Sequence, residues 1–183
     1  MTITLYHGTD RVFDRFEIRK DLAKTDITSL AEGYGIYFSL SESFAKSYGN
    51  FIYVVEVTED DYTDFTKEKE IKKLIATIEK GVGIPIRKYI DGDSIVEGIL
   101  AGDLSVLKLY KELTDWLDSQ YEFYEKYGNL VTYEDDCLFK KIEDLFFANI
   151  KDIARYYDKG FNADIFICHR NPEKLKPKRI VCE

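Results

Sequence analysis

The chain contains 183 residues, of which 45% are hydrophobic and 15% aromatic, and its formal net charge is −8. This composition excludes a disordered chain and predicts a packed globular protein. The length suits one domain with a sizeable core, so we expect a single domain over residues 1–183. Because nonspecific binding to nucleic acid depends on Lys and Arg side chains that neutralise phosphates, the acidic charge argues against a general DNA-binding protein.

Nothing in the sequence indicates export or a membrane. No stretch reaches the roughly 18 consecutive apolar residues that a transmembrane helix needs. The N-terminus lacks the basic region and the apolar run of a signal peptide. The three cysteines are too few and too scattered for a disulfide framework. We therefore expect a cytoplasmic protein without membrane association. The cysteines are Cys137, Cys168 and Cys182.

The first third of the chain predicts three strands and one short helix. Residues 3–7 alternate apolar and polar side chains, residues 36–39 follow two glycines, and residues 51–57 are almost entirely β-branched or aromatic. All three patterns favour strands. Ser39 and Glu42 have the spacing of a capping box, which predicts that a helix begins between the second and third strands.

The middle of the chain predicts helices. Apolar residues recur at helical spacing over residues 68–80 and again over residues 106–124, and Asp93 is expected to cap a helix that ends at Leu100. Thr132 is expected to cap a further helix, whose apolar face continues to Tyr157 and which ends at Gly160.

The chain is expected to close with two strands, over residues 163–168 and 179–182. Strands and helices do not alternate regularly along the chain, so the α+β class is favoured over a doubly wound sheet. The helical block, at about residues 62–147, is interpreted as an insertion in a β core.

Several common catalytic signatures are absent from the sequence. There is no dinucleotide-binding or phosphate-binding glycine motif, no zinc-protease motif and no nucleophile elbow. The two histidines, His7 and His169, lack the spacing of metal ligands, so we expect no metal site.

A group of motifs near the N-terminus remains. The segment 5–9 reads Leu-Tyr-His-Gly-Thr, and the segment 33–39 reads Gly-Tyr-Gly-Ile-Tyr-Phe-Ser. A helix with Ala45 and Tyr48 follows, and then the strand at 53–57. In this order the motifs resemble the ADP-ribosyltransferase superfamily. The likeness is to its His–Tyr–Glu branch, which includes poly(ADP-ribose) polymerases and diphthamide-modifying toxins, and especially to small bacterial and phage members.

The resemblance implies an ADP-ribosyltransferase-like split β-sheet core, with the helical block as its insertion, and NAD as co-substrate. The implied cofactor-binding residues are His7, Gly8, Thr9, Tyr37 and Tyr48. An aromatic ring beside the cationic pyridinium of NAD provides stacking and cation–π attraction, which suits the two tyrosines. Glycine has no Cβ, so its backbone can approach the nicotinamide amide closely.

The implied catalytic residues are His7, Tyr37 and an acid on a late strand. Cleavage of NAD passes through an oxocarbenium-like transition state, which a carboxylate stabilises electrostatically. Asp164 opens the predicted strand at 163–168 and is the favoured acid. Glu173 and Glu134 are the alternatives.

The resemblance therefore implies a mono-ADP-ribosyltransferase that modifies a macromolecule as a toxin, phage-defence or counter-defence factor. The acidic charge favours a protein over a nucleic acid as the target, and a cognate inhibitor or antitoxin is a further candidate partner. Two alternatives are an RNA 2′-phosphotransferase-like enzyme, which would need basic residues around a phosphate, and a catalytically inactive binding protein on the same fold.

Overall fold

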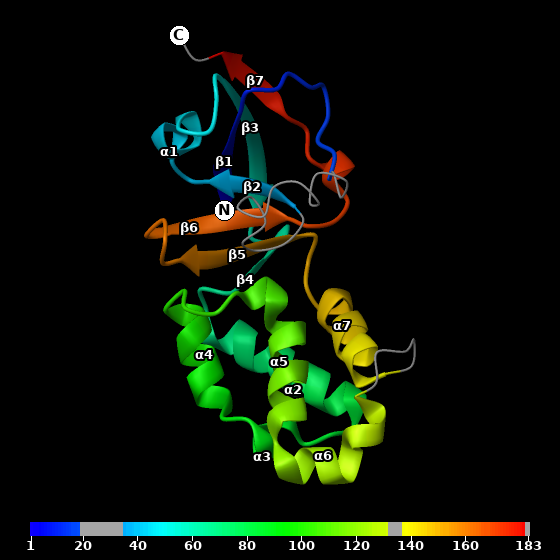
Figure 1. Ribbon diagram of the computed structural model, residues 1–183. Helices are drawn as coiled ribbons and strands as arrows, with labels where there is room; N and C mark the ends of the chain where they lie inside the picture. Colours follow the sequence, from blue (N-terminus) through cyan, green and yellow to red (C-terminus); the bar gives the residue numbers. More distant parts are fainter. Residues whose placement is uncertain (19–34, 132–136, 182–183) are drawn as a thin grey trace. The chain divides into compact units, whose positions relative to one another are not determined.

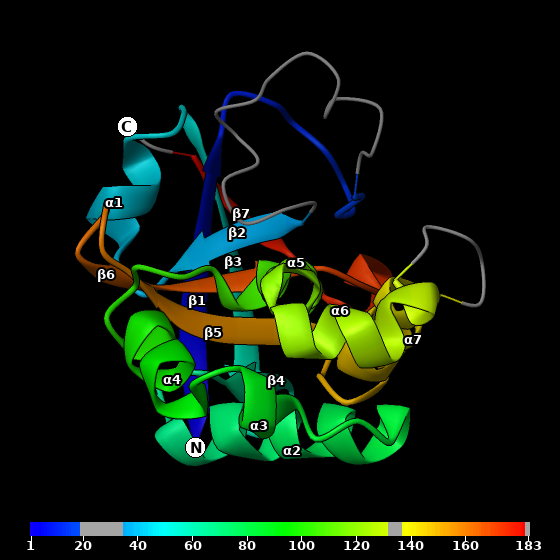
Figure 2. The same ribbon diagram turned by 60° about the horizontal axis from the view of Figure 1, so that its bottom comes forward.

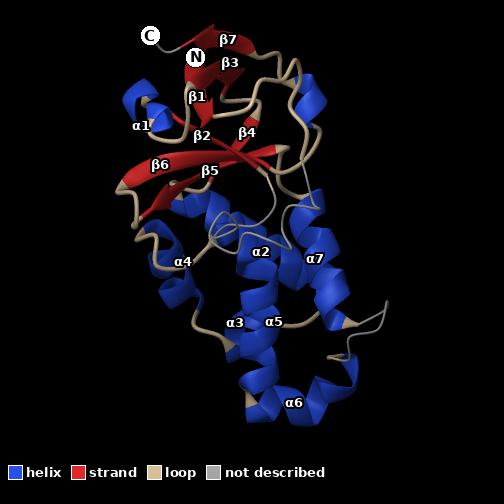
Figure 3. Cartoon of the chain, turned by 45° about the horizontal axis from the view of Figure 1, so that its top comes forward, coloured by secondary structure: helices blue, strands red, loops and turns tan. Residues whose placement is uncertain are grey.

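The computed structural model describes residues 1–18, 35–131 and 137–181, and the chain divides into two compact units. One unit combines residues Met1–Thr66 with Lys151–Glu183 and contains the strands. The other unit, Lys67–Ile150, is helical. The described strands all belong to the first unit, which also contains one short α-helix, and the described elements of the second unit are helices (Figure 3), which confirms the α+β class. The predicted start of the helical block, at about residue 62, falls on a short strand of the first unit.

The described strands form one seven-stranded sheet in the order β4-β5-β6-β2-β1-β3-β7 (Figure 1). All neighbours pair antiparallel except β4 and β5, which run parallel. The strands are β1 (Thr2–Thr9), β2 (Ile36–Ser39), β3 (Phe51–Thr58), β4 (Tyr62–Asp64), β5 (Ile153–Asp158), β6 (Ala163–Cys168) and β7 (Lys178–Val181). The predicted strands at 3–7, 36–39, 51–57 and 163–168 are confirmed.

The sheet has a seam between β1 and β2. These two strands share one register pair, Tyr6 with Ser39, whereas β1 pairs with β3 along its whole length and β2 pairs with β6 along its whole length. Next to this pair, the His7 side chain hydrogen-bonds the main chain of Tyr37. A side chain thus takes over part of the bonding between strands at the seam.

An apolar core covers one face of this sheet. Leu5 and Phe38 are among its buried members, and Phe16 packs on them from the segment that follows β1. The ring of Phe13 stacks on that of Tyr53 at 3.9 Å between centroids. Successive side chains of a strand point to opposite faces of the sheet. The residues that directly precede and follow these core residues along each strand therefore face the other side.

The short helix α1 (Glu42–Lys46) follows β2, but its cap differs from the expected one. Ser41 is the N-cap residue, and its hydroxyl accepts a hydrogen bond from the amide of Phe44. The Ser39 hydroxyl accepts from the amide of Ser41 instead. Ser39 is the last residue of β2, where it pairs with Ile165, and it lies two residues before the N-cap position.

The helical unit contains α2 to α7, and α2 is the longest of these described helices. Ile71, Leu74, Ile75 and Ile78 form its buried stripe, as the sequence pattern predicts. The predicted cap at Asp93 is wrong, because Asp91 accepts the capping hydrogen bonds. The helices are α2 (Glu68–Val82), α3 (Ile86–Tyr89), α4 (Gly92–Leu100), α5 (Leu109–Ser119), α6 (Tyr121–Tyr127) and α7 (Leu138–Ala148).

Two of the predicted helices differ from the observed elements: one is divided, and the other ends early and is followed by a strand. The apolar stripe at 106–124 runs through a 3₁₀ turn, α5 and α6, and the chain is extended at Gln120 between the two α-helices. The helix predicted to continue to Tyr157 ends at Ala148, and β5 follows. The Ile and Tyr residues of β5 suit a strand, and pairing with β6 overrides the helical spacing. Thr132, its predicted cap, lies outside the described residues.

Two observations on the described part of the chain concern membranes and metals. None of its helices is long and apolar enough to cross a membrane. It also contains no group of three or more His, Cys, Asp or Glu side chains arranged to hold a metal ion.

Candidate functional site

A cavity of about 260 Å³ lies between the sheet and the segment that contains α1. It belongs entirely to the strand-containing unit. The strands that form its floor, β5, β6, β2 and β1, are neighbours in the sheet (Figures 1 and 2). Its lining residues are Tyr6, His7, Gly8, Tyr37, Phe38, Ser39, Phe44, Ala45, Tyr48, Tyr156, Asp158, Phe161 and Ile165.

The floor of the cavity is a row of register-paired residues. Tyr156 pairs with Ile165, Ile165 with Ser39, and Ser39 with Tyr6. Paired residues of antiparallel strands carry their side chains on the same face. All four line the cavity, so the cavity opens on the face opposite the apolar core of Leu5 and Phe166.

Aromatic rings form the walls of the cavity. The ring of Phe44 lies 5.4 Å from that of Tyr48 and 5.4 Å from that of Phe161, measured between centroids. Tyr37 adds a further ring from β2. Tyr48 and Phe161 are 50% and 52% exposed, so aromatic surface is presented to solvent at the mouth. Such a site suits a flat ring, and a cationic ring above all.

Asp158 gives the cavity a negative charge. It is the last residue of β5, and its Oδ1 accepts a hydrogen bond of 3.1 Å from the amide of Phe161. Burial raises the pKa of Tyr48, and the charge of Asp158 raises that pKa further. The carboxylate therefore lies close enough to act electrostatically on the aromatic wall.

Gly8 lines the cavity and also allows α1 to approach the sheet. A Cβ at this position would lie 1.7 Å from the carbonyl oxygen of Ala45, so no larger residue fits without moving the helix. The resemblance implies that nicotinamide approaches the backbone of Gly8 closely. In the structure, the carbonyl group of Ala45 makes a close approach to this residue.

His7 lies at the seam of the sheet and contributes to the edge of the cavity, but its pairing with the buried Tyr53 places its ring on the core face. Its Nδ1 is 2.8 Å from the carbonyl oxygen of Tyr37. Because a carbonyl only accepts, Nδ1 carries a proton. Burial lowers the pKa of His7, which keeps the ring neutral near pH 7 and leaves Nε2 as an acceptor. The ring packs against Phe16 and Phe38.

The structure brings four of the five predicted cofactor-binding residues to one cavity: His7, Gly8, Tyr37 and Tyr48. Thr9 is not among the lining residues. It pairs with Phe51 at the end of β1, and its hydroxyl accepts a hydrogen bond from the amide of Arg11.

Asp164 does not line this cavity. It pairs with Tyr157, one residue away from the cavity-facing pairs on each strand, so its side chain lies on the opposite face. There it forms an ion pair with Arg155, which also pairs with the buried Asp64 at 3.4 Å. The alternative acid Glu173 is exposed in a short 3₁₀ turn. Glu134 lies outside the described residues.

Asp158 is the functional candidate that sequence reasoning missed. The apolar spacing that led into Tyr157 predicted a helix there, and the end of a helix gave no reason to place an acid in a cleft. A signal was present: Asp158, Lys159 and Gly160 form a polar turn between two segments rich in β-branched and aromatic residues. That arrangement is typical of a β-hairpin.

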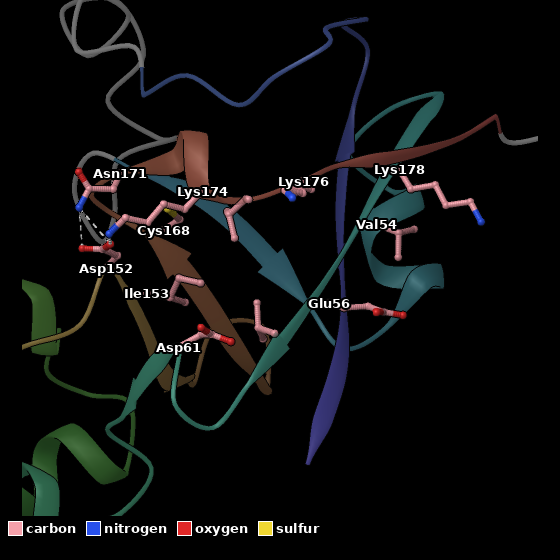
Figure 4. Close-up of a pocket in the computed structure, with 12 residues that line it drawn as sticks. Val54, Glu56, Asp61, Asp152, Ile153, Cys168, Asn171, Lys174, Lys176 and Lys178 are labelled. Atoms are coloured by element: carbon pink, nitrogen blue, oxygen red, sulfur yellow. Dashed lines mark hydrogen bonds and ion pairs between the residues drawn. The ribbon is translucent and has the colours of Figure 1, made fainter.

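A larger cavity, of about 520 Å³, lies at another place in the same unit (Figure 4). Its lining includes Asp152, whose carboxylate accepts hydrogen bonds from Asn171 at 3.0 Å and from Lys174 at 2.6 Å. Dashed lines mark these contacts in Figure 4. Arg170 adds a further ion pair at 2.7 Å, and these partners hold the pKa of Asp152 well below its usual value. The hydrogen bonds and ion pairs of the Asp152 carboxylate therefore hold the segment after β6 against the residue that precedes β5.

No protein-family profile matches this sequence, and no curated protein matches it. A solved crystal structure of an anti-CRISPR protein is similar to this chain, with a TM-score of 0.43 and 14% sequence identity. The similarity covers 98% of this chain and 96% of that one.

Proposed function

We propose that this protein is an NAD-consuming mono-ADP-ribosyltransferase that modifies a macromolecular target. The observation that carries the proposal is the convergence of the two motif segments on one cavity. His7 and Gly8 come from β1, and Tyr37 and Tyr48 come from β2 and the end of the α1 segment. The strand order, not their positions in the sequence, places them side by side.

The chemistry of the cavity supports NAD as the co-substrate. Its aromatic walls and the Asp158 carboxylate suit the flat, positively charged nicotinamide ring. Pockets that bury a whole drug-sized ligand measure about 300–1,000 Å³. At about 260 Å³ this cavity accommodates the nicotinamide end, and the rest of the dinucleotide would extend beyond it.

His7 is suited to hold the two motif segments together at the cavity. Its Nδ1 donates a hydrogen bond to the carbonyl oxygen of Tyr37 and so joins β1 to β2 beside Gly8. Because its ring packs on the core face of the sheet, its role in NAD binding is to position the backbone of β1 and β2 at the cavity.

The RNA 2′-phosphotransferase alternative receives less support. That reaction requires positive charge around a phosphate, and the described lining of the cavity includes neither Lys nor Arg. Arg15, one of the basic residues close to the His-Gly-Thr motif, is exposed and pairs with Glu17. Arg19 lies outside the described residues.

Incubation with NAD labelled in its adenine half tests the proposal. Transfer of label to a protein fraction, together with release of nicotinamide, is the expected result. Loss of a 2′-phosphate from RNA would favour the phosphotransferase instead. Binding of NAD without release of nicotinamide would identify a catalytically inactive binding protein, and no binding at all would contradict the proposal.

A further inference from the structure

The proposed reaction needs a carboxylate on the face of the sheet that borders the cavity, and the register of β5 and β6 shows which residues lie there. On β5 and β6 the pair Tyr156 and Ile165 faces the cavity. Two residues further along, the next pair on that face is Asp158 with Ala163. Asp158 lines the cavity, and Ala163 offers no polar group on β6.

Asp164 forms an ion pair on the face of the sheet opposite the cavity. Its carboxylate is paired with Arg155 on the other face of the sheet, and Arg155 joins it to Asp64, whose side chain is 7% exposed. Exposing Asp164 to the cavity would require the strand to shift by one residue, which would also move buried Phe166 out of the core. The packing of β6 therefore excludes Asp164 from the site.

Asp158 is positioned for a role in catalysis. The amide of Phe161 holds Oδ1, and Oδ2 makes no hydrogen bond with the described residues. The aromatic rings around the carboxylate exclude water in part, which strengthens its electrostatic interaction with a nearby positive charge.

We infer that Asp158, at the end of β5, is the catalytic carboxylate of this protein, in place of an acid on β6; this inference rests on the proposed function. In the reaction, the bond between the nicotinamide nitrogen and C1 of the ribose breaks, and its electron pair leaves with nicotinamide. The acceptor's oxygen or nitrogen then bonds to C1 and releases its proton to solvent. Asp158 stabilises the positive charge that develops on the ribose between these events.

Asp158→Asn tests the inference, because an amide oxygen can keep the hydrogen bond from Phe161 while the charge is lost. NAD affinity is measured by calorimetry, and turnover is measured as nicotinamide release with water as acceptor. We expect turnover to fall by about 10²–10³-fold with NAD binding retained. Asp118→Asn, at an exposed position on α5, controls for the loss of one acidic charge.

Two further variants sharpen the test. Asp164→Asn in a folded protein should retain much of the turnover, whereas Ala163→Glu in the Asp158→Asn background should recover part of it, because residue 163 pairs with Asp158 on the same face of the sheet. Near-normal turnover in Asp158→Asn, or its loss in folded Asp164→Asn alone, would overturn the assignment. A wild-type protein that does not bind NAD would instead overturn the proposed function, and one that binds NAD without cleaving it would overturn the catalytic role.

Discussion

At the scale of single residues, Tyr37 is the most direct test of the cavity. It lines the wall from β2, and stacking of an aromatic pair is worth roughly 0.5–1.5 kcal/mol beyond simple burial. Tyr37→Ala should therefore weaken NAD binding by about tenfold in a calorimetric titration. Tyr124→Ala, at a 58% exposed position on α6, is the matched control and should bind NAD normally. Unchanged affinity in a folded Tyr37→Ala protein would remove Tyr37 from the site.

His7 makes the stability of the protein depend on pH in a defined direction. Burial lowers the pKa of its folded form below the usual 6.5, so the unfolded chain takes up a proton first as pH falls. The free energy of unfolding should then decrease as pH drops through 6.5, and this contribution should be constant above that pH. Urea unfolding at about pH 8 and about pH 5.5 measures the difference.

His7→Asn is the appropriate variant, because its side-chain amide can keep the donor to Tyr37 without titrating. We expect a smaller decrease in stability on acidification than in the wild type. Burial also lowers the pKa of His169, the other histidine, so His169→Asn should remove a separate part of the same decrease. An acid response that is unchanged in both variants would contradict this explanation.

At the scale of elements, the contact between α1 and β1 depends on Gly8. A Cβ there would overlap the carbonyl of Ala45, and overpacking of this kind costs about 1–3 kcal/mol. Gly8→Ala should therefore lower the thermal unfolding midpoint and also weaken NAD binding, because α1 forms part of the cavity. Gly92→Ala, where a Cβ would meet only the Arg87 side chain at 3.5 Å, should lower neither. Equal stability in the two variants would show that α1 can move without cost.

The elements also show how far the sequence could be interpreted by itself. Strands with strong β-branched or aromatic content, such as β3, and amphipathic helices, such as α2, were predictable because local pattern and tertiary packing agree in them. The strand β5 could not be predicted, because Ile153 and Tyr157 have helical spacing and only the pairing with β6 makes the segment extended. Because this segment was predicted as a helix, Asp158 at its end was not considered as a site residue. The family resemblance grouped the motif residues at 7, 8, 37 and 48, and these residues line one cavity. The face on which Asp164 lies depends on a strand register that local patterns do not determine.

At the scale of the whole molecule, the residues of the cavity all belong to one unit, and many acidic side chains belong to the other. An acidic surface steers charged partners toward a protein. We therefore expect the helical unit to affect target recognition more than NAD cleavage. Replacing Asp118, Glu122 and Glu125, all exposed on α5 and α6, by Lys should reduce transfer to the target while nicotinamide release is retained.

The control for this prediction reverses three acids of the strand-containing unit, and its target transfer should fall less. Equal losses of target transfer and nicotinamide release in the α5–α6 variant, with the fold intact, would contradict the division of roles. The three control acids are the exposed residues Glu17, Glu59 and Asp60.

The parallel pairing of β4 and β5 has a consequence for how this protein can vary. Parallel neighbours require a crossover of a dozen or more residues, and here the whole helical unit is that crossover. Both junctions are tied to the sheet, by the amide of Phe65 on the carbonyl of Arg155 and by the amide of Lys151 on the hydroxyl of Thr63. We therefore expect that other segments long enough for the crossover can replace the one between these junctions while the cavity is retained, whereas a tight turn cannot. We expect such an exchange to change the target of the proposed transfer reaction.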